Sequence, residues 1–194
     1  MKILRNIILL VAVSTCFTGC EPPMPPSDEE MVRHFATHEA AFDRVREVIA
    51  DCTANSFHYP PLAPEYDIAL DSLGKPIEEQ AEVNRSVFGQ PEWVKFELDS
   101  LWSETGCCFM HVDRMERDAA DSSVLRLTMV YYSHGIVDAG TSKCFVYDPE
   151  LRNRPNIRIT EHGDLNEIYR RTYSDTTLYK PVKGNWYIEL DHSR

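Results

Sequence analysis

The sequence lacks the short motifs that mark common catalytic and nucleotide-binding sites. Its 194 residues contain no Walker loop, no Gly-x-Gly-x-x-Gly, no Gly-x-Ser-x-Gly nucleophile turn and no His-Glu-x-x-His zinc-protease signature. No cofactor is therefore expected. Because many active sites leave no signature in the sequence, the question of an enzyme stays open, with the balance toward a non-enzymatic protein.

Basic residues are scarce. Twenty Lys and Arg face 31 Asp and Glu, which gives a formal net charge of −11. A strongly acidic surface repels phosphate backbones, so nucleic acid is not an expected partner. Among partners, a basic protein or a cation fits the charge better than nucleic acid, but simple solubility is the first explanation of an acidic surface.

No apolar run reaches the about 20 residues that a transmembrane helix needs. Residues Ile7 to Val13 are aliphatic, Lys2 and Arg5 precede them, and residues 14–19 are mostly small or polar. A charged start, a short apolar stretch and a small-residue cleavage zone are typical of an export signal. We therefore expect residues 1–19 to be removed.

The stretch Phe17-Thr18-Gly19-Cys20 at the end of this signal resembles the lipobox of bacterial lipoproteins, although Leu is usual at the position of Phe17. The resemblance implies cleavage before Cys20 and a diacylglycerol on its sulfur, with Cys16 as a competing candidate. Acyl chains, including palmitate, would then anchor the chain to the cell membrane. By the same resemblance, Glu21 favours the periplasmic side of the outer membrane within the cell envelope.

Four prolines lie between residues 21 and 27, which predicts a semi-rigid spacer after the lipidated cysteine. The expected organisation is a signal peptide over 1–19, a lipidated Cys20 with a Pro-rich spacer over 20–27, and one domain over 28–194. That length is enough for one buried core.

A long amphipathic helix is predicted to start at Ser27, because Glu30 follows three residues later as in a capping box, and to end near Asp51 or Cys52. Its apolar stripe recurs at steps of three and four residues. The stripe consists of Met31, Phe35, His38, Phe42, Val45 and Ile49. A weaker second helix is expected over residues 77–88, and a short strand or turn over 66–70.

The rest of the chain has the pattern of β-strands. Strands are expected over residues 93–102, 107–112, 124–132 and 143–147, followed by a C-terminal hairpin of residues 178–182 and 186–190 around Lys183-Gly184-Asn185. Helices followed by strands indicate an α+β fold, with the long helix packed on a mostly antiparallel sheet. This order, with Gly140-Thr141-Ser142-Lys143 before a strand, resembles other small uncharacterised bacterial lipoproteins and brings no activity with it.

Four cysteines remain after Cys16 and Cys20, namely Cys52, Cys107, Cys108 and Cys144. In an oxidising envelope they permit two disulfides in three connectivities. We expect at least one bridge, joining Cys52 or Cys144 to one of the adjacent pair. A redox disulfide between Cys107 and Cys108 and buried free thiols are the alternatives.

Two pairs of residues that contain histidine could carry chemistry. His34 and His38 lie four residues apart on the long helix, where such a pair can bind a metal, but zinc needs three or four ligands and a core-facing histidine is the other explanation of His38. His111 and Asp113 share one side of a predicted strand and could contribute to a hydrolytic dyad.

The leading hypothesis is a membrane-anchored envelope lipoprotein whose domain binds a protein partner or supports a complex without catalysis. The alternatives are a metal-dependent or hydrolytic periplasmic enzyme, centred on His34 and His38 or on His111 and Asp113, and a small-ligand binder with a pocket between helix and sheet.

Overall fold

The computed structural model describes residues 24–52, 56–60, 92–116, 123–136, 139–172 and 174–193. The predicted signal, the lipobox at Cys20, the expected helix over 77–88 and the strand or turn over 66–70 lie outside the described residues. The remaining predictions can be compared with the structure directly.

The N-terminal helix α2 (Asp28–Ala50) begins where the cap was predicted. The backbone N–H of Glu30 donates to the hydroxyl oxygen of Ser27 at 3.2 Å. The last turn contains no basic residue of its own. Instead the guanidinium of Arg114 donates to the carbonyl oxygens of Ile49 and Cys52, both at 2.7 Å, and so places a cation at the negative end of the helix.

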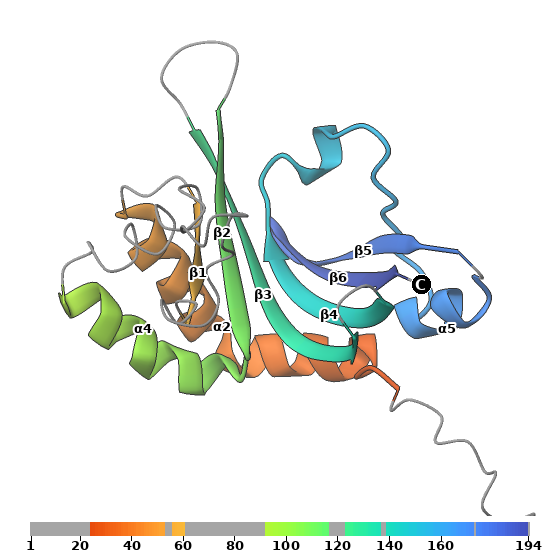
Figure 1. Ribbon diagram of the computed structural model, residues 1–194, viewed down its shortest axis with the longest axis horizontal. Coiled ribbons are helices and arrows are strands. Elements are labelled where there is room, and N and C mark those ends of the chain that lie inside the picture. The colour runs from red at the N-terminus through yellow and green to blue at the C-terminus, as the bar shows by residue number, and fades with distance from the viewer. Residues whose placement is uncertain are drawn as a thin grey trace, which may run out of the picture.

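A six-stranded sheet follows, in the order β1-β2-β3-β4-β6-β5. All neighbouring strands are antiparallel, which confirms the α+β prediction. The bounds are β1 (Ser56–Tyr59), β2 (Phe109–Glu116), β3 (Ser123–Ile136), β4 (Ala139–Tyr147), β5 (Thr176–Lys183) and β6 (Trp186–Ser193). The predicted C-terminal hairpin is confirmed as β5 and β6, and Gly184 in its turn has a φ of +58°. Figure 1 shows the curved sheet with α2 lying across its base.

The predicted strand over residues 93–102 is wrong, because this segment is the helix α4 (Glu92–Thr105). Its buried residues Val94, Leu98 and Leu101 are spaced by four and three, which is the period of a helix. Residues 93–102 also alternate loosely between apolar and polar, which is the period of a strand, and this second pattern led to the wrong prediction. Helix α4 packs beside α2 (Figure 1).

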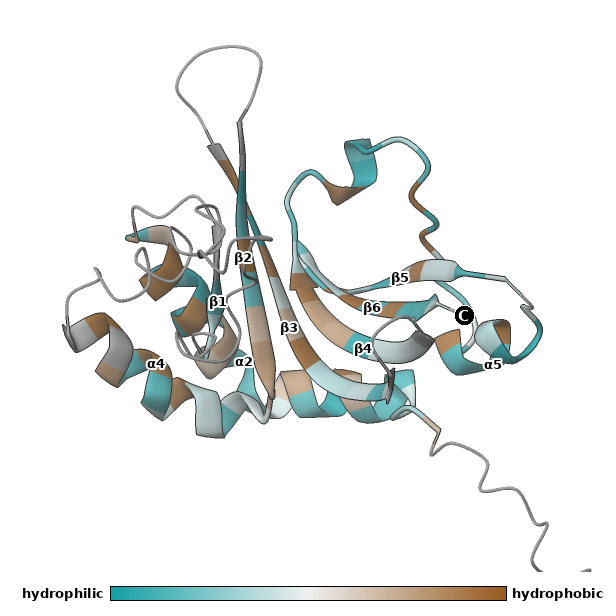
Figure 2. Cartoon of the chain, viewed as in Figure 1, coloured by the Kyte–Doolittle hydropathy of each residue, from teal (hydrophilic) through white to brown (hydrophobic). Residues whose placement is uncertain are grey.

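The core lies between α2 and the sheet, and aromatic rings fill it. The ring of Phe42 lies 4.7 Å from that of Phe145 on β4, and the ring of Phe35 lies 5.5 Å from that of Trp186 on β6. On β3, Leu127 and Met129 lie two residues apart and both face this core. Apolar and polar bands alternate along β2 and β3 in Figure 2. These rings occupy the place proposed for a ligand pocket between helix and sheet.

The opposite face of the sheet carries a smaller core under the segment that follows β4. Leu151 of the short helix η2 (Leu151–Asn153) packs there with Tyr179 and Tyr187. The helix α5 (Leu165–Arg170), which the sequence did not predict, returns the chain to the start of α2. Within the described ranges, no helix is long and apolar enough to cross a membrane.

Candidate functional site

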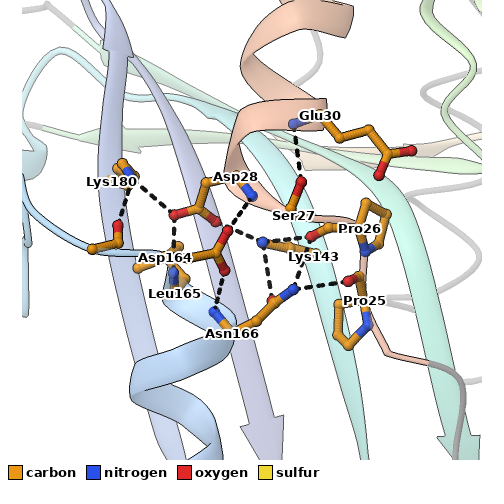
Figure 3. A network of polar contacts seen from close by, with 11 residues as sticks. Pro25, Pro26, Ser27, Asp28, Glu30, Lys143, Asp164, Leu165, Asn166 and Lys180 are labelled. Atoms are coloured by element: carbon orange, nitrogen blue, oxygen red, sulfur yellow. Dashed lines mark hydrogen bonds and ion pairs between the residues drawn. The ribbon is translucent and has the colours of Figure 1, made fainter.

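Buried polar side chains tie the segment before α2 to the sheet. We call this group the junction network, and it consists of Asp28, Lys143, Asp164, Asn166 and Lys180 (Figure 3). The side chain of Lys143 is fully buried, and its ammonium lies 2.6 Å from one carboxylate oxygen of Asp28. The ammonium of Lys180 lies 3.1 Å from the other oxygen. Two carboxylates and two ammonium groups therefore balance in charge, as buried ions require.

The same network grips the backbone of the predicted spacer. The ammonium of Lys143 donates to the carbonyl oxygen of Pro26 at 2.7 Å. The side-chain amide of Asn166 donates to the carbonyl oxygens of Pro25 and Pro26, at 2.8 and 3.2 Å. Proline lacks an N–H, so its carbonyl is its one backbone hydrogen-bonding group, and here both carbonyls are satisfied by the domain.

The starts of α2 and α5 are also fastened to each other. The backbone N–H of Asp28 donates to the carboxylate of Asp164 at 2.8 Å, and the N–H of Leu165 donates to the carboxylate of Asp28 at 2.9 Å. Each carboxylate thus satisfies a free N–H at the start of the other helix. The end of the spacer is consequently fixed to two helices and to strands β4 and β5.

The predicted pair His34 and His38 has a packing role in the structure. Nε2 of His34 donates to the carbonyl oxygen of Thr105 at 2.8 Å, and Nδ1 of His38 donates to that of His34 at 2.9 Å. The two rings lie 4.4 Å apart, and the ring of His34 is 4.8 Å from that of Tyr131 on β3. His34, rather than His38, therefore faces the sheet. In the part of the chain that the structure describes, no three or more His, Cys, Asp and Glu side chains form a metal-binding group.

A different histidine lies opposite His111. His58 on β1 is the direct cross-strand partner of His111 on β2, and their Nδ1 atoms are 3.3 Å apart. We call these two residues the histidine pair. Burial lowers the pKa of both imidazoles, and Arg126 lowers that of His111 further while Asp113 opposes the shift. Asp113 lies two residues along β2 from His111, so the predicted His111 and Asp113 do share a face.

An ion pair is also buried on this face. The guanidinium of Arg126 lies 3.1 Å from the carboxylate of Glu189 and donates to the hydroxyl of Tyr179 at 3.3 Å. Burial raises the pKa of Glu189, although the hydrogen bond with Tyr179 and the charge of Arg126 act against the increase. Both partners hold the carboxylate in place, so this group compensates buried charge rather than offering a free acid.

The predicted disulfide is absent, because Cys52, Cys107, Cys108 and Cys144 are all free thiols. Cys107 follows Gly106, whose Cβ position would lie 3.5 Å from the ring of His34. Cys52 lies about five turns further along α2, roughly 27 Å away. Cys107 is buried and Cys108 is exposed. Burial raises the pKa of Cys107 to about 12.

An open hollow of about 340 Å³ lies where the β3–β4 hairpin meets the end of β6. Its lining is polar and comprises Ser133, His134, Gly135, Gly140, Thr141, Ser142, Asp191 and Ser193. Much of this lining is bonded within the fold: Thr141 pairs with Nδ1 of His192 at 2.9 Å, and Asp191 accepts from Thr177 at 2.6 Å.

Sequence reasoning missed the residues that the structure brings together here. Lys143 had a visible signal, since it is a charged residue at the start of the apolar run Cys144 to Tyr147. Asp28 has a sufficient local explanation, because a negative charge is favourable at the start of a helix. His58 lies in a Pro-rich segment for which the sequence predicts no strand, so nothing indicated its pairing with His111.

A family model described as a domain of unknown function, DUF4948, matches residues 24–194. No curated protein and no solved structure matches the chain.

Proposed function

We propose that this chain, which belongs to the DUF4948 family, is a cell-envelope lipoprotein anchored through Cys20 whose domain binds a protein partner or supports a complex without catalysis. The observation that carries the proposal is the junction network, because it fixes the backbone at Pro25 and Pro26 to the sheet. A tether that must orient a domain needs such a firm point of attachment.

The spacing supports a domain held close to the membrane. The chain from a lipidated Cys20 to the fixed Pro25 can span at most about 18 Å. The net charge of −11 disfavours contact with anionic headgroups. The tether would therefore set the orientation of the domain. The negative charge would keep the surface of the domain off the anionic headgroups and available to a partner with a basic surface.

The anchor is tested with the full chain in its own envelope. Metabolic acyl labelling and membrane fractionation are compared for the unaltered protein, for Cys20→Ala and for Cys16→Ala as the matched control. We expect Cys20→Ala alone to lose the label and to leave the membrane fraction. A label that survives in Cys20→Ala would contradict the anchor.

The partner is tested by crosslinking in the same cells, followed by purification and mass spectrometry. We expect one stoichiometric protein partner that is lost with Cys20→Ala and retained with Cys16→Ala. A chain that crosslinks to no protein would contradict the binding role while leaving the anchor intact.

A further inference from the structure

The two Nδ1 atoms of the histidine pair are separated by the distance expected between two ligand atoms of one metal ion. His58 and His111 face each other directly across two antiparallel strands, so the backbone ladder fixes their separation. Their Nδ1 atoms are 3.3 Å apart and their ring centroids 4.6 Å apart. In a tetrahedral zinc site with Zn–N bonds of about 2.05 Å, the two nitrogen atoms lie roughly 3.3 Å apart.

The surroundings of the pair hold its rings in place and bring a carboxylate near them. The ring of Phe109 stacks on that of His58 at 5.0 Å and restricts its rotation. Asp113 lies on the same face, where its carboxylate adds negative charge near His111.

We propose that His58 and His111 bind a divalent late transition-metal ion, Zn²⁺ in the first place, on the sheet face turned away from α2. Imidazole nitrogen is a ligand that Zn²⁺, Cu²⁺ and Ni²⁺ share, whereas Mg²⁺ and Ca²⁺ prefer oxygen. Zinc needs three or four ligands, so the two histidines form only part of a site, and water or a side chain of a bound partner supplies the remaining ligands.

Zinc binding is measured on the metal-stripped full chain in detergent, by competition with a chromogenic chelator. The test variants are His58→Asn and His111→Asn, and the matched control is His162→Asn, at an exposed position. We expect one Zn²⁺ per chain, affinity weakened at least tenfold in each test variant, and less than a twofold change in the control. Equal affinity in all four proteins, or no binding by the unaltered chain, overturns the site.

A second measurement needs no variant and covers the case in which a substitution unfolds the chain. Diethyl pyrocarbonate modifies accessible neutral imidazoles, and mass spectrometry locates each modified histidine. We expect Zn²⁺ to slow modification of His58 and His111 but not of the exposed His134 and His162. Equal rates with and without Zn²⁺ at His58 and His111 overturn the proposal, and the pair is then only a hydrogen-bonded contact.

Discussion

The two ends of the sheet treat buried polar side chains in opposite ways. At the β4–β5 end, the carboxylate of Asp28 meets the ammonium groups of Lys143 and Lys180. At the β1–β2 end, His58 meets His111, a group of its own kind. At the first end the carboxylate and the ammonium groups neutralise each other, and adding or removing a proton would leave one buried charge without its partner. The second end has no opposite charge in the pair itself and can take up a cation or a proton.

This difference separates a mechanical role from a binding role. The junction network joins two helices, two strands and the spacer backbone, so its loss affects the whole domain. The histidine pair joins only an edge strand of four residues to its neighbour. A perturbation there can change ligand binding and local pairing while the core persists.

The largest effect is expected from Lys143→Met. The substitution removes the ammonium and keeps an unbranched side chain one atom shorter, so the buried carboxylate of Asp28 retains Lys180 but loses its closer cationic partner. Removing one member of a buried ion pair costs about 3–5 kcal/mol, and the remaining Lys180 places the loss near 3 kcal/mol. Chemical denaturation of the purified chain measures the change in the free energy of unfolding.

Lys183→Met is the matched control, because it makes the same substitution at an exposed ion pair with Glu39. Exposed pairs contribute about 0–1 kcal/mol. If the two variants lose equal stability, the junction network is not the fixed attachment described above.

The sequence predicted most elements because local signals and packing agree in them. Ser27 caps α2, and the stripe from Met31 to Ile49 meets the sheet except at His38, where the helix is kinked and His34 faces the sheet instead. The prediction failed at α4, where Val94, Leu98 and Leu101 give the helical period but Trp93 to Trp102 also alternates loosely. A short segment with two compatible periods is decided by its packing, which the sequence does not display.

The candidate sites were less predictable, because both depend on contacts between distant segments. Asp28 and Lys143 are 115 positions apart in the chain, and His58 and His111 are separated by 53. In the sequence, Asp28 is fully explained by its place in the first turn of a helix, where a negative charge is favourable. Nothing in the sequence therefore pointed to its contact with Lys143. Only the register of β1 against β2 could have indicated the histidine pair.

A smaller effect, confined to the other end of the sheet, is expected from pH. The pKa of both His58 and His111 is lowered in the folded chain, so the unfolded chain binds more protons below its ordinary histidine pKa. The pair therefore stabilises the fold above that pKa, and the contribution is lost as the pH falls from 7 toward 5. The double variant His58→Asn/His111→Asn should lose less stability over this range than the unaltered chain.

The measurement is denaturant unfolding at several pH values, with His162→Asn as the control. Carboxylates such as Glu189 titrate alike in all three proteins and cancel in the comparison. The same slope of stability against pH in the double variant and the unaltered chain would show that the pair is not held in its neutral form.

The smallest effect on stability is expected from substitutions of the cysteines. The two ends of the sheet should instead differ in how fast their thiols react. Cys108 precedes β2 near the histidine pair and is exposed, whereas Cys144 follows Lys143 on β4, is buried, and has its pKa raised by that burial. Because the thiolate is the reactive form, Cys108 should react first with a thiol reagent in the native chain, and Cys144 only on unfolding. Cys108→Ser should abolish the fast reaction and change stability by less than about 0.5 kcal/mol, whereas Cys144→Ser should retain it. A fast phase that persists in Cys108→Ser would contradict the assigned exposure, and no reactive thiol even after unfolding would show that the cysteines are bridged.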